Sequence, residues 1–217
     1  MPSRRSPRWS RIERDARTTY GELIAGVDEV GRGPLAGPVV ACAIIMPSTG
    51  RRIPGVDDSK RLNAASREAL VDEIRARAVA LGIGAASARE VDHLNIYHAT
   101  TTAMRRALAR LGVVPDHVIV DGKPIRTLGV AHTAVVGGDG KCYAVACASI
   151  VAKVTRDRLM HRLAARYPGF GWEQNAGYGT PAHMAALEAL GATPHHRRSF
   201  CVKQLSLSLT AGPPPDE

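Results

Sequence analysis

Three short apolar segments of this chain each lead into acidic residues, with glycine close by, and this repeated pattern constrains the fold more than any other feature. The segments and their acids are residues 23–27 with Asp28 and Glu29, residues 117–120 with Asp121, and residues 133–136 with Asp139. Continuous apolar runs of this length predict strands buried inside a sheet. Because α/β proteins build their sites at strand ends that share one crevice, the acids are expected to lie together.

The chemistry of these acids indicates a divalent metal site. Carboxylates crowded at neighbouring strand ends repel one another unless cations lie between them. A set of oxygen ligands selects Mg²⁺ or Mn²⁺ over zinc, and two such ions roughly 3.5–4 Å apart can drive an in-line phosphoryl displacement. We therefore predict Asp28, Glu29, Asp121 and Asp139 as metal ligands and catalytic residues. The side chains of consecutive strand residues point to opposite faces, so Asp28 and Glu29 cannot both reach one site from a regular strand. The strand alternation is therefore expected to fail at Glu29.

Length and charge narrow the class of protein. A chain of 217 residues can bury one good core, and a net charge of +9 favours a polyanionic partner, nucleic acid first. No apolar run approaches the roughly 20 residues that span a bilayer, and the basic amino-terminus lacks the apolar core of a secretory signal. We therefore expect a cytoplasmic protein that does not enter a membrane. Its four cysteines show no zinc-like spacing and are expected to be buried, reduced thiols.

The rest of the chain predicts alternating strands and helices. Expected domain bounds are a basic arm over residues 1–20 with up to two helical turns, a catalytic domain over 21–203 whose helical extension starts near 168, and a disordered tail over 204–217. Further strands are expected over residues 39–46 and 80–87, a turn over 88–93, and helices over 63–79, 95–111, 144–166 and 181–190. The cluster from His195 to Arg198 fits either a solvated basic face or a phosphate contact. Asp157, between two arginines, fits a salt bridge or a capping group.

The sequence does not support three other phosphate-binding or catalytic motifs. Gly31 and Gly33 resemble a dinucleotide-binding loop, but Pro34 and Pro38 follow where the phosphate-binding helix should begin. The chain contains no P-loop pattern, and no serine lies in a nucleophile elbow. A metal-dependent phosphodiester site remains the better interpretation.

The ordered motifs together resemble the ribonuclease HII family, the type 2 ribonucleases H. They are Ala25 to Gly37, Asp58 to Leu62, Asn95 to Thr100, Val120 to Gly122, Gly138-Asp139, Ala148 to Asp157, Gly177 to Gly179 and His196 to Phe200. The resemblance implies a ribonuclease H-like α/β fold, with a mixed five-stranded sheet flanked by helices and a carboxy-terminal helical extension. It also implies cleavage on the 5′ side of a ribonucleotide embedded in duplex DNA, or of RNA in RNA–DNA hybrids. Such cleavage leaves 5′-phosphate and 3′-hydroxyl ends and removes misincorporated ribonucleotides.

Site residues follow from the same resemblance. The four acids match the family's metal ligands, and Gly31, Arg32 and Gly33 match the loop that senses the ribose 2′-hydroxyl. Tyr178 matches the tyrosine that packs on the next, deoxy sugar. Candidate phosphate contacts are Ser59, Lys60 and Lys153. Gly137 replaces a lysine that many members carry.

Two alternatives to this function remain at the level of sequence. One is another metal-dependent nuclease on the same fold, and the other is a non-catalytic nucleic-acid-binding module whose acids hold a structural ion. A monomer is the expected assembly in each case.

Overall fold

A computed structural model describes residues 11–49 and 51–201, and its centre is one five-stranded sheet. The strand order is β3-β2-β1-β4-β5. The bounds are Ile24–Val30 for β1, Val39–Ile45 for β2, Ala80–Ala86 for β3, His117–Asp121 for β4 and His132–Val135 for β5. The first three strands pair antiparallel, whereas β4 runs parallel to β1 and β5 runs parallel to β4. The predicted mixed five-stranded sheet is confirmed.

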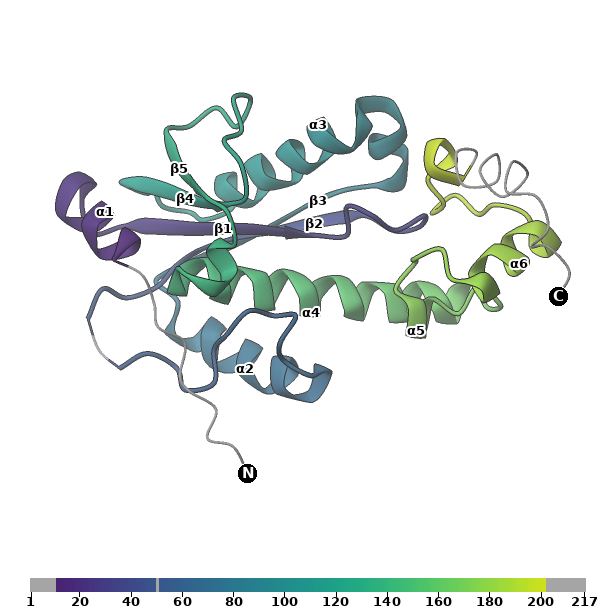
Figure 1. Cartoon of the computed structure of the whole chain (residues 1–217), viewed down its shortest axis with the longest axis horizontal. Helices are drawn as coiled ribbons and strands as arrows, with labels where there is room; N and C mark the ends of the chain where they lie inside the picture. The colour runs from purple at the N-terminus through teal and green to yellow at the C-terminus, as the bar shows by residue number, and fades with distance from the viewer. Residues whose placement is uncertain (1–10, 50, 202–217) are drawn as a thin grey trace, which may run out of the picture.

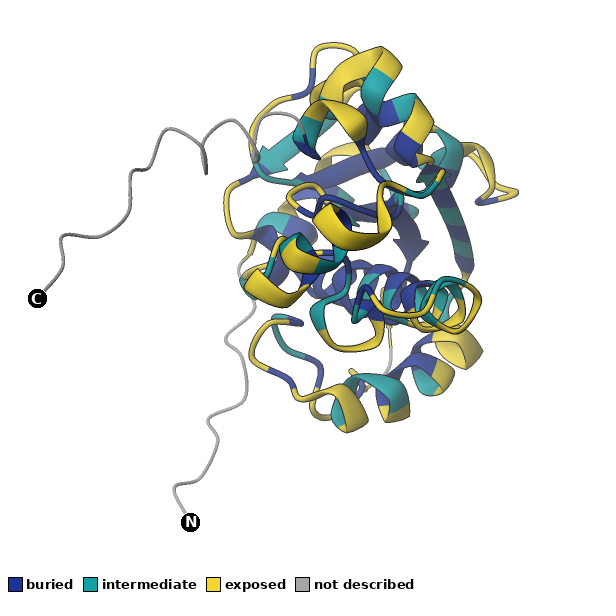
Figure 2. Ribbon diagram, turned by 90° about the vertical axis from the view of Figure 1, so that its right-hand side faces the viewer, coloured by how far each residue is buried: buried dark blue, intermediate teal, exposed yellow. Residues whose placement is uncertain are grey.

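Helices cover both faces of this sheet (Figure 1). Helix α3, Ala88–Ala109, lies on one face, while α4, Tyr143–Arg166, and α2, Ala64–Arg77, lie on the other. Strands β1, β2 and β4 are mostly buried between these layers, whereas β3 alternates between buried and half-buried residues and β5 is largely half-buried (Figure 2). Small residues allow the close approach: a Cβ at Gly84 would lie 2.0 Å from the Ala103 carbonyl oxygen of α3. The four cysteines are buried and reduced, as predicted.

The predicted turn over residues 88–93 is wrong, because α3 already begins at Ala88. Ser87 and Glu90 form a capping box that starts the helix there. The helix then kinks at Asn95, which takes a φ of 65° and whose side-chain oxygen accepts hydrogen bonds from the Tyr97 and His98 amides. The helix expected from Asn95 is therefore the second half of a longer one.

The amino-terminal helix α1, Ile12–Tyr20, is tied to the core through Glu13. This carboxylate is buried and accepts hydrogen bonds from the Tyr143 and Ala144 amides at the start of α4. Acceptors at this position satisfy amides that have no partner within the helix. The predictions for residues 1–10 and for the tail over 204–217 lie outside the described residues.

The carboxy-terminal extension lies at the far end of α4 (Figure 1). It contains α5, Trp172–Asn175, and α6, Pro181–Leu190. Ala36 and His196 form an isolated antiparallel bridge, and the Gly37 amide donates to the His195 carbonyl. The extension therefore returns to the loop that follows β1, which brings two sequence motifs far apart in the chain into contact.

Candidate active site

Asp28 and Asp121 are brought to the same level by the parallel pairing of β1 and β4. The last paired residues are Val27 and Val120, so each acid is the next residue along its strand. Asp139 does not sit on a strand but on a short 3₁₀ helix, η1, Gly138–Gly140. The Gly138 amide donates to Asp121 Oδ1 at 2.6 Å, which fixes η1 against the end of β4. Regular strand pairing and one backbone contact thus assemble the acids.

The expectation that the alternation fails at Glu29 is wrong. The ladder continues without a break through Asp28 opposite Cys42 and Glu29 opposite Ala41, up to Val30. Asp28 therefore faces α4, where Ser149 hydrogen-bonds to it, and Glu29 faces α3. The two carboxylates still influence each other and Asp121, because the sheet ends here and the neighbouring strand stops at Asp121.

Burial makes this group of acids electrostatically costly. Burial, the Glu29 charge and the Asp121 charge together raise the pKa of Asp28 well above its usual value. Burial also raises the pKa of Glu29, against the opposing effect of Arg32, and the pKa of Asp121, against the Gly138 amide. Cations therefore stabilise the site, and two side chains supply them: Arg32 Nη1 lies 3.1 Å from Glu29, and Lys60 Nζ lies 3.0 Å from Asp139.

The four acids suit a divalent metal by their chemistry. Their donors are all oxygens, their charges crowd one another, and Lys60 already places a cation on Asp139. In their present orientations, no three acidic, histidine or cysteine side chains of the described residues lie close enough together to bind one metal ion. Each carboxylate is instead engaged by a nearby donor, such as the Glu29 amide on Asp28. The set that would hold metal is Asp28, Glu29, Asp121 and Asp139.

The candidate phosphate contacts separate into exposed and buried groups. The Lys60 side chain is 79% exposed and reaches Asp139 at the site. Ser59 is buried instead, and its hydroxyl lies 2.8 Å from that of Ser149, which in turn contacts Asp28. Lys153 pairs with Asp157 at 2.6 Å, which agrees with the salt bridge expected for Asp157. Of the three, the structure leaves Lys60 best placed to meet a phosphate.

The loop after β1 lies against the tyrosine loop of the extension. A Cβ at Gly33 would lie 3.5 Å from Tyr178 Cε1, and the tyrosine is 50% exposed. The Gly177 carbonyl accepts hydrogen bonds from the Leu35 and Ala36 amides, so the two loops share backbone contacts. Exposed Arg32 and half-exposed Tyr178 therefore flank the glycines on the same side of the molecule as the acids.

Two buried arginines that the sequence interpretation missed hold these loops together. Arg156 donates to the carbonyls of residues 36, 38 and 176, and Arg197 donates to those of residues 31, 32 and 37. Neither of the two interpretations of the His195–Arg198 cluster holds for His196 or Arg197, because both side chains are buried, whereas Arg198 is exposed. The sequence offered one signal for each arginine: Arg156 lies in a largely apolar helix, and Arg197 lies in a His-Arg-Arg run.

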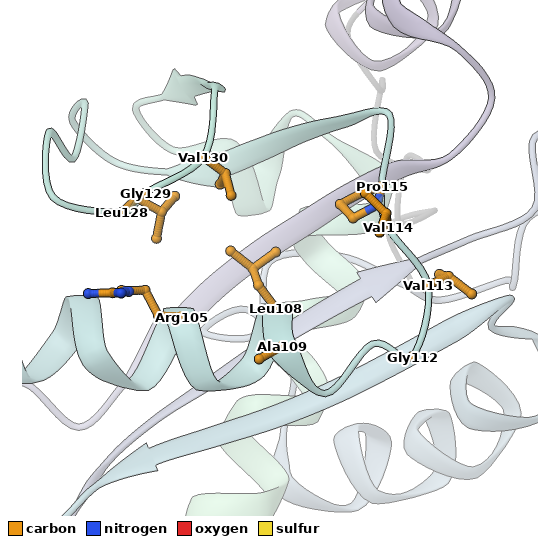
Figure 3. Close-up of a pocket in the computed structure, with 10 residues that line it drawn as sticks. All are labelled: Arg105, Leu108, Ala109, Gly112, Val113, Val114, Pro115, Leu128, Gly129 and Val130. Atoms are coloured by element: carbon orange, nitrogen blue, oxygen red, sulfur yellow. The ribbon is translucent and has the colours of Figure 1, made fainter.

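A hollow of about 520 Å³ adjoins the acids on the α3 side. It is lined by Glu29, Asp121, Tyr97, Met104 and Lys123, among others. A second hollow of about 460 Å³ lies beside the last turn of α3, between the loops over residues 112–115 and 128–130 (Figure 3). Its lining is mostly apolar and includes no acid. Of these two hollows, only the first is lined by carboxylates of the candidate site.

Comparison with known proteins agrees with this geometry. The sequence profile of the family described as Ribonuclease HII matches residues 25–203. The chain belongs to the ribonuclease HII family. A Ribonuclease HII of Granulibacter bethesdensis is 54% identical over 200 residues, which cover 90% of each chain. Membership makes this chain an endoribonuclease of ribonuclease H type 2, in a family that acts on nucleic acid and depends on divalent metal.

Solved structures of ribonucleases H show the same fold. The crystal structure of the ribonuclease H2 from Pyrococcus horikoshii OT3 is 28% identical, with a TM-score of 0.72 over 86% of this chain and 99% of that one. A structure of Bst-RNase HIII in complex with Mn²⁺ is 18% identical and shares the fold, with a TM-score of 0.64 over 90% of this chain and 73% of that one. Among the described residues, no helix has both the length and the apolar character needed to cross a membrane.

Proposed function

We propose that this enzyme cuts the phosphodiester on the 5′ side of a ribonucleotide embedded in duplex DNA, and RNA within RNA–DNA hybrids. The products would carry 5′-phosphate and 3′-hydroxyl ends, and the cellular role would be the removal of misincorporated ribonucleotides. The observation that carries the proposal is the contact between the Gly31–Gly33 loop and Tyr178 beside the acids. This contact places the loop, which is suited to recognise a ribose, beside Tyr178, which is suited to recognise the neighbouring sugar.

The loop is suited to distinguish RNA from DNA through its backbone. The 2′-hydroxyl both donates and accepts, so bare backbone groups at a glycine can pair with it where a side chain would obstruct the approach. Gly31 has a φ of 87°, and a Cβ there would lie 2.1 Å from Arg156 Nε. Only glycine fits this buried position, where it lets the loop pack against Arg156, so the exposed backbone offered to a ribose is that of Arg32 and Gly33.

Tyr178 and the cations complete the proposed substrate contacts. The half-exposed ring of Tyr178 presents an apolar face to the sugar after the ribonucleotide, where a 2′-hydroxyl would clash. Arg32 and Lys60 lie at the acids and would balance the charge of the phosphates there. We propose that Ser59 supports Ser149 and Asp28 rather than a phosphate. Lys153, paired with Asp157, would contact phosphates of the nucleic acid further from the cleaved bond.

The four acids are proposed to hold Mg²⁺ or Mn²⁺, with two ions when substrate is bound. Such ions supply an activated water and stabilise the leaving oxygen in phosphoryl transfer. The protein's own part is to keep Asp28 and Asp121 level on parallel strands and to orient Asp28 through Ser149. A monomer is proposed as the active form.

The test uses three duplexes of one sequence, with Mg²⁺ or Mn²⁺ supplied in separate reactions. One strand carries a single ribonucleotide, a run of ribonucleotides, or none. We expect a single cut 5′ of the lone ribonucleotide and no cut in the all-DNA duplex. Equal cutting of all-DNA would indicate another nuclease specificity, and no cut at the lone ribonucleotide would overturn the proposal. Alkali-sensitive sites in the genome of a deletion strain would report the cellular role.

A further inference from the structure

Two histidines are buried side by side in the carboxy-terminal extension, outside the site described above. His183 is fully buried and His196 is 2% exposed, and their Nε2 atoms lie 3.1 Å apart. Trp172 Nε1 lies 3.1 Å from His183 Nε2, and His183 Nδ1 lies 2.8 Å from the Tyr178 carbonyl oxygen. The pair is therefore connected directly to the backbone of the tyrosine proposed to read the substrate.

The partners of these rings fix which nitrogen carries each proton. A carbonyl oxygen only accepts, so His183 Nδ1 carries hydrogen and donates to Tyr178. An indole N–H only donates, so His183 Nε2 carries the lone pair. On His196, Nδ1 accepts from the Thr193 amide, which leaves the proton on Nε2 to point at His183. Both rings are therefore neutral, each in a single tautomer.

The surroundings favour this neutral state. Burial lowers the pKa of His183, and burial together with His183 and His195 lowers the pKa of His196 to about 4. The nearby buried guanidiniums of Arg156 and Arg197 already place positive charge beneath the same loops. An added proton on His183 would have to occupy Nε2, against two N–H groups. His183 therefore stays neutral, with its Nδ1 proton donated to the Tyr178 carbonyl oxygen.

We propose that His183 is a positioning residue for Tyr178, and that Trp172 and His196 act through it by holding its tautomer. The donated hydrogen bond fixes the Tyr178 carbonyl, and with it the direction in which the ring leaves the backbone. Gly177 and Tyr178 are otherwise held by backbone contacts to residues 35, 36, 175 and 180 and by the Asn175 side chain, which accepts from the Gly177 amide. Because the role of Tyr178 is itself proposed, this inference rests on the proposed function.

The test compares two amide substitutions of His183 that differ only in reach. His183→Asn places its amide near the Nδ1 position and keeps the donor to Tyr178, whereas His183→Gln places it near Nε2 and does not. The readout is the ratio of kcat/KM for a lone ribonucleotide followed by DNA to that for the same ribonucleotide followed by RNA. We expect His183→Asn to keep this ratio and His183→Gln to lower it about three- to tenfold, as the loss of one neutral hydrogen bond does.

A double-mutant cycle separates positioning from stability. In a Tyr178→Ala background, His183→Gln should change the ratio no further, because it acts through the missing ring. Leu70→Ala in α2 destabilises the enzyme away from the extension and should keep the ratio. Additive effects of the two site variants, or a lowered ratio in Leu70→Ala, would overturn the inference.

The outcomes also distinguish this inference from the proposed function. A wild-type enzyme that does not cut at the lone ribonucleotide would overturn the proposed function, whereas one that cuts both substrates equally well would overturn the proposed role of Tyr178 and this inference with it. A wild-type preference that His183→Gln leaves intact would overturn the positioning role alone. Should His183→Gln not fold, Trp172→Phe carries the test, because it removes the N–H that holds His183 Nε2 as an acceptor. We expect about a twofold or greater loss of preference there, and a wild-type ratio would overturn the inference.

Discussion

Replacing Arg197 by glutamine should destabilise the enzyme far more than the same change at its neighbour Arg198. The Arg197 guanidinium is fully buried and makes four hydrogen bonds to the carbonyls of Gly31, Arg32 and Gly37. Among the described residues, no carboxylate lies within ion-pair distance of it, so its buried charge is compensated mainly by these carbonyls and by the Phe200 ring, whose centroid lies 5.3 Å from the guanidinium carbon. Arg198 is exposed, and its side chain takes no part in that network.

The size of the effect follows from the carbonyls left behind. A glutamine amide has two N–H groups on a shorter side chain, so at least one and up to three of these carbonyls lose a partner. Each costs about 1–3 kcal/mol, and removal of a buried, unpaired charge offsets part of that sum. We therefore expect Arg197→Gln to lower the free energy of unfolding by about 2–4 kcal/mol, a large share of the roughly 5–15 kcal/mol that a folded domain has.

The measurement is urea denaturation followed by far-ultraviolet circular dichroism, with Arg198→Gln as the matched control. The control should stay within about 0.5 kcal/mol of the wild type, as exposed substitutions do. At a temperature where Arg197→Gln remains folded, its kcat/KM on the single-ribonucleotide duplex should also fall, because the Gly31–Gly33 loop loses its support. A loss of stability below about 1 kcal/mol would refute the assignment of Arg197 as the buried anchor of this loop.

Three further predictions concern the acids and their cations. Asp121→Asn should abolish turnover while duplex affinity, measured by fluorescence anisotropy, stays the same or improves, since it removes negative charge that faces a polyanion; full activity would show the acid to be misassigned. Asp28→Asn should raise the free energy of unfolding of metal-free enzyme at pH 7 by at least about 1 kcal/mol, because a buried carboxylate beside Glu29 and Asp121 is costly; a destabilised variant in chelator would contradict this. Lys60→Met should lower the Mn²⁺ concentration for half-maximal activity and raise KM, because the ammonium that competes for Asp139 also meets the phosphate; an unchanged metal requirement would place Lys60 outside the site.

The acids were predictable because strand ends leave a local trace in sequence. An apolar run followed by an acid and glycine marked Asp28 and Asp121, and the parallel register of β1 and β4 then set them level. Asp139 was found by the same pattern, although it lies on η1 after a slightly earlier strand end. The error at Glu29 arose because a distorted strand was expected to turn Asp28 and Glu29 to the same face of the sheet. The strand is regular instead, so the two side chains leave it on opposite faces.

The supports of the site left no comparable trace. Arg197 meets its carbonyl partners across 160 residues of chain or more, and a carbonyl is present at every position. Nothing in the letters of a sequence marks which carbonyls an arginine will bind. Ser59 was predicted to contact a phosphate, but it is buried against Ser149, a partner 90 residues away that no local pattern indicates. The missed start of α3 was more accessible, since Ser87 and Glu90 have the spacing of a capping box.

The contact from Glu13 to the first amides of α4 bears on where the folding unit begins. A domain boundary placed after residue 20 assigns α1 to a dispensable arm, yet its carboxylate is the partner of two amides 130 and 131 residues downstream. A shortened chain starting at residue 21 would expose those amides at the foot of the helix that also carries Ser149. Trimming the front of the polypeptide would thus loosen the scaffold directly behind Asp28.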